Sequence, residues 1–292
     1  MIVRSSGRYV PQLMEIWKSV FGDSDEYIRL FFERMYSHAE SLLHVEGEKV
    51  LSMLFFPRCS IRVLGRVYRA GYVCGAATLP EARGKGLMDG LLKTSFHLML
   101  ERGDSFSVLI PGDDNLYGFY SKYDYRALFK RGVATYSANA FRAAGHGRLS
   151  LVKTDDASAI SSLYSEIVSD MEVVVLKDEA AYRLVMDVYS TYGSIYLVMD
   201  GRKAAGYVFC QYHEGEKVLF AKEMMSRRDI LDETAGMLAD IYRPGKVVVE
   251  GPYRSGTGFP GARRTGMLKV LDGSFEASDL DRGYPYMNMM LD

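Results

Sequence analysis

The stretch Gly71–Gly90, GYVCGAATLPEARGKGLMDG, decides the fold of this chain. Its first part, Tyr72–Leu79, is apolar and β-prone with small residues at its centre, which predicts a buried strand that another group approaches closely. Pro80 ends this run. A basic glycine turn, Arg83–Gly86, then precedes apolar residues at helical spacing as far as about Arg102. The predicted order is therefore a strand, a glycine turn and an amphipathic helix.

The glycine turn lies where the predicted helix begins. The N–H groups of the first helical turn have no partner within the helix and the helix dipole is positive there, so this end binds anions. Gly84 and Gly86 let the main chain curl around an anion, while Arg83 and Lys85 add charged contacts. A pyrophosphate fits this description. The turn is also compatible with an ordinary helix start whose basic side chains are solvated, and it matches neither G-x-x-x-x-G-K-[ST] nor G-x-G-x-x-G.

The order of strand, R-G-x-G turn, helix and a second strand at 106–110 resembles the coenzyme A pyrophosphate loop of the GCN5-related N-acetyltransferase (GNAT) superfamily. The family pattern is Q/R-x-x-G-x-G/A, and Met88 departs from its final small residue. The resemblance implies a pyrophosphate loop formed by Arg83, Gly84, Lys85, Gly86, Leu87 and Met88. It also implies a bulged strand whose N–H groups bind the thioester and pantetheine arm of acetyl-CoA, formed by Val73, Cys74, Gly75, Ala76, Ala77 and Leu79.

A tyrosine-rich segment, Phe119–Tyr125 (FYSKYDY), resembles the FY-x-[KR]-x-G-[FY] segment of the same superfamily. By that match, Tyr120 protonates the departing thiolate of coenzyme A. A phenol titrates near pH ~10, so it carries its proton at neutral pH and is able to donate it. Asp124 stands where the family has glycine, and a left-handed turn tolerates Asp at some cost. Because the chain has 21 tyrosines, ordinary packing is the alternative role for Tyr120.

Two helical patterns, Tyr9–Phe21 and Asp25–Ser37, meet at an acidic elbow. The segment Trp17–Phe32 resembles the acceptor-side helices of the enhanced intracellular survival branch of the superfamily. Carboxylates there would attract a cationic amine. The candidate acceptor-binding residues are Asp23, Asp25 and Glu26. A capped, acid-rich first helical turn is the alternative explanation for these carboxylates.

The composition narrows the possible partners. The chain has 36 Lys and Arg against 37 Asp and Glu, a net charge of −1, so no overall field recruits nucleic acid or an anionic membrane. The sequence predicts no apolar leader and no membrane span, and hence a cytoplasmic protein. The spacing of three cysteines and five histidines predicts reduced, buried thiols and no metal site.

The order of strands, turns and helix at 42–102 recurs in the second half of the chain. At the equivalent of the glycine turn the second half has KEMMSRRD at 222–229, which lacks the glycines that a pyrophosphate needs. The predicted fold class is α/β, a mixed sheet flanked by helices, in two tandem GNAT-like domains. The predicted segments are a domain with the coenzyme A site at 1–142, a degenerate domain at 143–265 and a tail at 266–292.

The tandem arrangement resembles the enhanced intracellular survival acetyltransferases over about residues 1–265, with the tail as a reduced third domain. In that group the terminal carboxylate assists deprotonation of the amine, which implies a catalytic role for Asp292. An apolar closing strand at Tyr286–Leu291 is the alternative for the end of the chain. The resemblance also makes a homo-oligomer reasonable.

These features predict an acetyl-CoA-dependent N-acetyltransferase. A primary amine of a small molecule, or a lysine of a peptide or protein, attacks the thioester directly, and Tyr120 acts as the general acid. Tandem GNAT-like domains also occur in aminoacyl transferases that use charged tRNA, although the near-neutral charge gives no sign of a basic face. A non-catalytic module that binds acyl-CoA is a third alternative.

Overall fold

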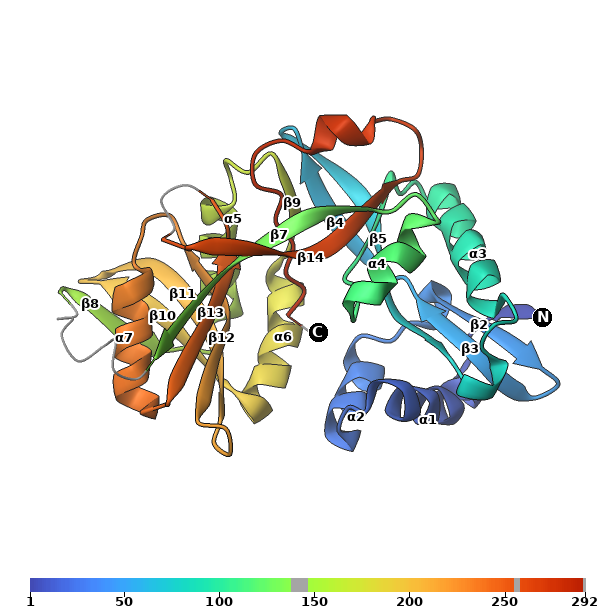
Figure 1. Ribbon diagram of the computed structural model, residues 1–292, viewed down its shortest axis with the longest axis horizontal. Coiled ribbons are helices and arrows are strands. Elements are labelled where there is room, and N and C mark those ends of the chain that lie inside the picture. The colour runs from blue at the N-terminus through green and yellow to red at the C-terminus, as the bar shows by residue number, and fades with distance from the viewer. Residues whose placement is uncertain (138–146, 255–257, 291–292) are drawn as a thin grey trace. The chain divides into compact units, whose positions relative to one another are not determined.

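The structure is a computed structural model that describes residues 1–137, 147–254 and 258–290 (Figure 1). The chain divides into two compact units. Unit 1 comprises Met1–Ile61, Arg66–Ala127 and Gly266–Asp279, and unit 2 comprises Arg62–Gly65, Leu128–Thr265 and Leu280–Asp292. The units interleave along the chain, whereas the predicted segments 1–142, 143–265 and 266–292 are contiguous. These domain boundaries stay a prediction.

Unit 1 contains a mixed sheet in the order β1-β2-β3-β5-β6-β14, with β4 beside β5. Its strands are β1 (Ile2–Arg4), β2 (Ser41–Glu46), β3 (Lys49–Phe55), β4 (Arg58–Val63, as far as Ile61), β5 (Arg66–Thr78), β6 (Phe106–Leu109) and the second half of β14 (Gly261–Val270). Along this order the neighbours are antiparallel, except that β5 and β6 are parallel. The parallel pair requires a crossover, and this crossover contains the helix that follows the glycine turn.

Helices cover both faces of this sheet (Figure 1). They are α1 (Val10–Phe21), α2 (Asp25–Arg34), α3 (Leu87–Glu101) and α4 (Asp114–Ser121). Because side chains alternate along a strand, Met53 and Phe55 pack with α1 and α2, while Leu54 and Phe56 pack with α3 and α4. Both faces of β3 are therefore buried.

The ends of the unit 1 helices follow their local sequence. Gly22 ends α1 in the left-handed conformation, with φ of 74°, which glycine adopts without steric cost. The Ser24 side chain caps α2 by accepting a hydrogen bond from the Tyr27 N–H at 3.2 Å. The helix predicted over Asp25–Ser37 ends at Arg34, because the chain turns into a short 3₁₀ segment before β2.

Unit 2 repeats this architecture. Its strands are β7 (Arg126–Ser137, from Leu128 onward), β8 (Leu149–Lys153), β9 (Val173–Leu176), β10 (Ser194–Asp200), β11 (Lys203–His213), β12 (Val218–Ser226) and β13 (Lys246–Pro252). Its helices are α5 (Ala157–Ile167), α6 (Glu179–Tyr192) and α7 (Leu231–Tyr242). The sheet order is β7-β13-β12-β11-β10-β8, and β12 and β13 are its parallel pair.

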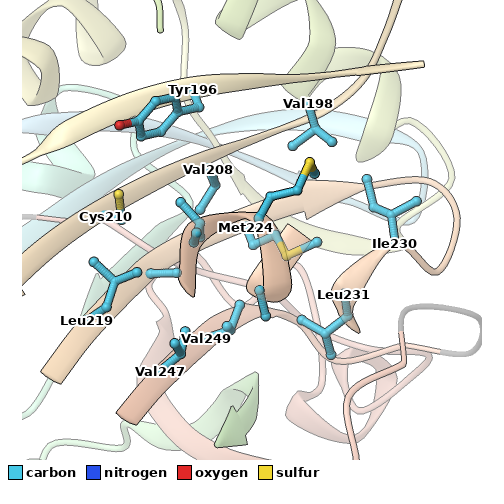
Figure 2. Close-up of a cluster of buried hydrophobic side chains, with 14 of the residues drawn as sticks. Tyr196, Val198, Val208, Cys210, Leu219, Met224, Ile230, Leu231, Val247 and Val249 are labelled. Atoms are coloured by element: carbon cyan, nitrogen blue, oxygen red, sulfur yellow. The ribbon is translucent and has the colours of Figure 1, made fainter. Parts of the chain in front are cut away.

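The core of unit 2 is also formed by alternating side chains. Val208 and Cys210 of β11 face α7, in the cluster that Figure 2 shows. Phe209, between them, faces the other way and contacts Tyr182 and Tyr189 of α6, with ring centroids 6.1 and 5.1 Å apart. The predicted α/β class, with a mixed sheet flanked by helices, is confirmed in both units.

Two features of the second half differ from the sequence expectation. The strands β9, β13 and β14 are not among the predicted elements. Of the closing strand predicted at Tyr286–Leu291, the described residues form a single parallel bridge between Val174 and Tyr286. Its backbone hydrogen bonds join Val175 N to Tyr286 O and Tyr286 N to Val173 O, both at 3.1 Å.

Candidate functional site

The strand β5 extends beyond its parallel neighbour. The last registered pair between β5 and β6 is Val73 with Leu109, whereas β5 continues to Thr78. The residues 74–78 therefore have β3 on one side and no registered β6 partner on the other. Backbone N–H and C=O groups are obligatory hydrogen-bonding groups, so this edge is suited to an extended ligand.

The predicted bulge lies within this extension. Met53 and Phe55 are two residues apart on β3, but their partners on β5, Ala77 and Cys74, are three residues apart. The strand therefore carries one extra residue, which bends it away from a regular ladder. Gly75 lies in the bulge with φ of 54°, a left-handed conformation that favours glycine.

Aromatic rings enclose this glycine. A Cβ atom at Gly75 would lie 2.4 Å from Cδ2 of Phe55 and 2.9 Å from Cζ3 of Trp17. The close approach that the small residues of the strand predict is therefore an approach of β5 to these two rings. Neither Trp17 nor Phe55 is a predicted site residue, because a sequence signals that a position must be small without naming what lies beside it.

The glycine turn is open. Gly84 and Gly86 have φ of 76° and 73°, and a Cβ atom at either would meet nothing within 4 Å. Gly86 is the N-cap of α3 and provides no side-chain cap, and the first helical hydrogen bond runs from Gly90 N to Gly86 O at 3.3 Å. Within the described chain, the N–H groups of residues 84–89 donate to no protein acceptor. These donors are available to an anion.

The charged residues of the turn are solvent-exposed. Arg83 donates from Nε to the carbonyl oxygen of Thr78 at 3.2 Å, so its guanidinium is held beside the end of β5. Lys85 lies between the two left-handed glycines. Leu87 and Met88 are half-buried at the start of α3, and Met88 packs against the core cluster that contains Tyr120. Met88 thus occupies the position of the family's small residue with its side chain packed against the core cluster.

Tyr120 lies where β5 and β6 part. It belongs to the same buried cluster as Val73 and Leu109, the last parallel pair. Its ring makes edge contacts with Phe119 and Tyr125, at centroid distances of 5.1 and 5.8 Å. Its hydroxyl has no hydrogen-bond partner among the residues that the structure describes. The phenol therefore presents an uncommitted donor at the parting of the strands.

Burial raises the pKa of Tyr120 to about 12, and the neighbouring Cys74 and Tyr123 add to the rise. Desolvation disfavours the charged form of an acid, so the phenol keeps its proton at neutral pH. The helix that carries it is capped by Asp113, whose Oδ1 accepts from Asn115 N at 2.7 Å. Asp124 adopts the predicted left-handed turn, with φ of 65°.

The three carboxylates of the acidic elbow have different surroundings. Asp23 accepts a hydrogen bond from Nε1 of Trp17 at 2.8 Å, and the ring of Trp17 lies beside Gly75 in the β5 bulge. Asp25 forms an exposed ion pair with Lys18 at 2.6 Å. Asp25 and Glu26 line a surface hollow of about 490 Å³ formed by α1 and α2. The structure links Asp23, through Trp17, to the strand that carries Gly75.

Asp292, the predicted catalytic carboxylate at the end of the chain, lies outside the described residues. The described chain contains no group of three or more His, Cys, Asp or Glu side chains placed to hold a metal ion. In the same residues, no helix combines the length and apolar character needed to cross a membrane. Burial raises the pKa of the Cys59 thiol to about 12 and raises that of Cys74, so both cysteines are poor nucleophiles.

A comparison with protein families found a match over the first part of the chain. Residues 3–128 match the family described as acetyltransferase (GNAT) domain. This segment contains the bulged strand, the glycine turn and Tyr120. No curated protein matches the sequence of the chain.

Solved structures share the fold over most of the chain. A GCN5-related N-acetyltransferase from Kribbella flavida superposes with a TM-score of 0.73 at 17% identity, covering 93% of this chain and 71% of that one. A probable N-acyltransferase from Enterococcus faecalis V583 gives 0.77 at 16% identity, with 93% and 72% covered. Eis1 from Mycobacterium abscessus gives 0.69 at 11% identity, with 93% and 74% covered.

Proposed function

We propose that the chain, whose residues 3–128 match the family described as acetyltransferase (GNAT) domain, belongs to the GNAT superfamily and transfers acetyl from acetyl-CoA to a primary amine. The acceptor is an amine of a small molecule or a lysine of a peptide or protein. The observation that carries the proposal is the convergence, within unit 1, of an open glycine turn, a bulged strand edge and the uncommitted hydroxyl of Tyr120.

The glycine turn fits a pyrophosphate. The left-handed glycines leave the space above the turn free, and the N–H groups of residues 84–89 have no protein acceptor in the described chain. Arg83 and Lys85 add two positive charges that oppose the pyrophosphate charge. These groups bind and orient acetyl-CoA, which supplies the acetyl thioester.

The free edge of β5 fits the pantetheine arm. The proposed binding residues are Val73, Cys74, Gly75, Ala76, Ala77 and Leu79. Because pairing with β6 ends at Val73, the N–H groups beyond it are available to the arm and to the thioester oxygen. Donors that are already oriented stabilise negative charge on that oxygen without further reorganisation.

Tyr120 donates a proton from its hydroxyl to the coenzyme A sulfur as the carbon–sulfur bond breaks. The burial that raises its pKa to about 12 ensures that this proton is present at neutral pH. The attacking amine is neutral, and its proton leaves to a base. Asp292 is the proposed base, while Asp23, Asp25 and Glu26 attract the cationic form of the acceptor before deprotonation.

Ligand-dependent thermal unfolding tests the cofactor site. Saturating acetyl-CoA, at 100 times its dissociation constant, is expected to stabilise the native state by about 2.7 kcal/mol and to raise the midpoint. Arg83→Glu should weaken or abolish this shift. Arg66→Glu is the matched control. It makes the same charge change at an exposed position at the start of β5, the end of the strand away from the glycine turn. An equal shift in wild type and Arg83→Glu, or no shift at all, contradicts the proposed site.

Turnover of the Tyr120→Phe variant tests the acid. General acid catalysis contributes about 10²–10⁴-fold, so turnover should fall by about 10² or more while acetyl-CoA still raises the midpoint. Tyr117→Phe, on the same helix, is the control and should retain activity. Full turnover by Tyr120→Phe would show that Tyr120 is not the general acid.

The assay also separates the alternatives. Release of free coenzyme A in the presence of an amine panel supports acetyl transfer. Amine-dependent consumption of aminoacyl-tRNA without coenzyme A release supports an aminoacyl transferase. Binding of acetyl-CoA without turnover on any amine supports a binding module. The expected homo-oligomer and the cytoplasmic location stay predictions, and light scattering of the purified chain tests the former.

A further inference from the structure

Unit 2 contains a cavity of about 430 Å³ that the acetyl-transfer site does not use. It lies between the end of α5, the turn joining β10 to β11, and the segment Ser226–Asp229, which begins with the last residue of β12. That segment is the SRRD of the KEMMSRRD stretch, which in unit 2 stands in the place of the glycine turn. The cavity volume falls within the range of about 300–1,000 Å³ that is typical of small-molecule sites.

Positive charge dominates the walls of this cavity. Four cationic side chains line it against two carboxylates: Arg148, Lys203, Arg227 and Arg228 against Glu166 and Asp200. The formal balance of the lining is therefore +4 − 2 = +2. A dianion neutralises this excess.

The arginines are held in place by their neighbours. Asp200 binds Arg228 at 2.7 Å and Arg148 at 3.4 Å, so one carboxylate holds two guanidinium groups at the same wall. Arg227 donates from Nε to the carbonyl oxygen of Glu166 at 3.1 Å and also contacts Ser169 Oγ at 2.9 Å. A guanidinium has five N–H donors, and Arg228 donates one side-chain hydrogen bond within the described chain. Further donors remain for a ligand.

The floor of the cavity is apolar. Leu163 and Ile167 of α5 and Ala204 of β11 contribute its apolar side chains, whereas Ala205 packs against the α7 cluster on the other face of the sheet. The small side chain of Ala204 leaves room above the sheet, and Ile167 is buried. A flat apolar group on this floor would place an attached anion among the arginines.

The helix that follows the SRRD segment does not compete for that anion. Oδ1 of Asp229 accepts from Leu231 N at 3.3 Å, and Asp232 and Glu233 lie in the first turn of α7. These carboxylates oppose binding of an anion at the helix N-terminus. In unit 2, the positive charge of this segment is therefore provided by arginine side chains that line the α5 side.

We propose that this cavity binds a small dianion with a flat apolar body, of the class of aryl phosphate monoesters. The apolar body packs on Leu163 and Ala204, and the phosphate accepts from Arg228 and Lys203. This site is separate from the proposed coenzyme A site and does not depend on it.

The full chain titrated with 1-naphthyl phosphate, followed by naphthyl fluorescence, tests the proposal. We expect saturable 1:1 binding in wild type, at least tenfold weaker binding in Arg228→Ala, and similar weakening in Ala204→Leu, which fills the floor. Arg202→Ala, an exposed residue of the same turn that does not line the cavity, should bind as wild type does. Inorganic phosphate and 1-naphthol should each bind more weakly than the combined probe.

Four outcomes overturn the proposal. The first is an absence of saturable binding up to millimolar probe. The second is equal affinity in wild type, Arg228→Ala and Ala204→Leu. The third is equal binding of inorganic phosphate, which removes any role for the apolar floor. The fourth is displacement by acetyl-CoA or loss in Arg83→Glu, which assigns the probe to unit 1. Unchanged circular dichroism of the variants confirms that they are folded.

Discussion

Both units interrupt the corresponding strand of their sheet with a bulge, but a glycine lies at the bulge of unit 1 and a buried carboxylate at that of unit 2. In unit 1, parallel pairing ends at Val73, and Gly75 follows two residues later. In unit 2, parallel pairing ends at Ala221, and Glu223 follows two residues later. The register between β11 and β12 shifts at this point, as it does between β3 and β5.

Side chains from other parts of unit 2 form hydrogen bonds to the bulge of β12. The carboxylate of Glu223 accepts from Lys177 Nζ at 2.5 Å, Tyr286 OH at 2.9 Å and Tyr207 OH at 3.0 Å, and all four side chains are buried. Asn288 Nδ2 donates to the carbonyl oxygen of Lys222 at 2.9 Å. Residues of the C-terminal segment therefore bond to the strand extension that unit 1 leaves accessible.

This difference separates the proposed ligand site of unit 1 from the polar core of unit 2. The backbone feature is the same in both units: a strand extends beyond its parallel partner and carries a bulge. In unit 1 a glycine lies at the bulge and the strand edge has no registered partner. In unit 2 the carboxylate of Glu223 lies there and belongs to a polar network that holds the C-terminal segment. We therefore expect unit 2 to bind no acyl-CoA, because both the glycine turn and the free strand edge are missing.

The largest expected effect comes from breaking the unit 2 network. Glu223→Gln leaves the buried Lys177 ammonium without its counter-charge, and removing one partner of a buried ion pair costs about 3–5 kcal/mol. Chemical denaturation measures the loss. The double variant Lys177→Met, Glu223→Gln removes the unpaired charge and should recover more than half of it. Equal destabilisation of the single and double variants would show that the ion pair is not the cause.

The next effect comes from closing the unit 1 bulge. In Gly75→Ala, the added Cβ meets Phe55 and Trp17 in a left-handed conformation, so we expect destabilisation of about 2–4 kcal/mol. Gly84→Ala is the matched control. It has a similar φ but open space around the Cβ, so the cost should be ~1 kcal/mol. Denaturation midpoints that are equal for the two variants would contradict the close approach.

A smaller effect is expected at the link between Glu223 and the C-terminal segment. Tyr286→Phe removes one hydrogen bond to a charged acceptor while Lys177 and Tyr207 remain, which should cost about 1.5–3 kcal/mol. Tyr284→Phe, at an exposed position two residues earlier, should leave stability unchanged. If Tyr286→Phe were also neutral, the segment would not be anchored through this hydroxyl.

The smallest expected effect concerns the pH dependence of turnover. Burial raises the pKa of Tyr120 to about 12, so this phenol stays protonated well into the alkaline range and produces no fall in rate below about pH 11. Any alkaline limb at lower pH belongs to another group. The pH profiles of wild type and Tyr120→Phe should therefore have the same shape at different heights. An alkaline limb below pH 10 that vanishes in Tyr120→Phe would contradict the raised pKa.

The sequence by itself determined the local elements. The order of strand, glycine turn and helix, the left-handed turns at Gly22 and Asp124, and the cap at Asp113 follow from residues close together in the chain. Such features depend on backbone sterics and on hydrogen bonds that span a few residues, so their signals are local. The α/β class follows from the periodicity of the same short segments.

Only the tertiary structure decided what lies against these elements. The rings of Trp17 and Phe55 around Gly75, the tyrosines around Glu223 and the arginines of the unit 2 cavity come from segments far apart in the chain. The interleaved units and the strand β14 also arise from pairing over long separations. A residue's own sequence neighbourhood states that it is small, apolar or charged, but its partners are selected by the packing of the whole fold.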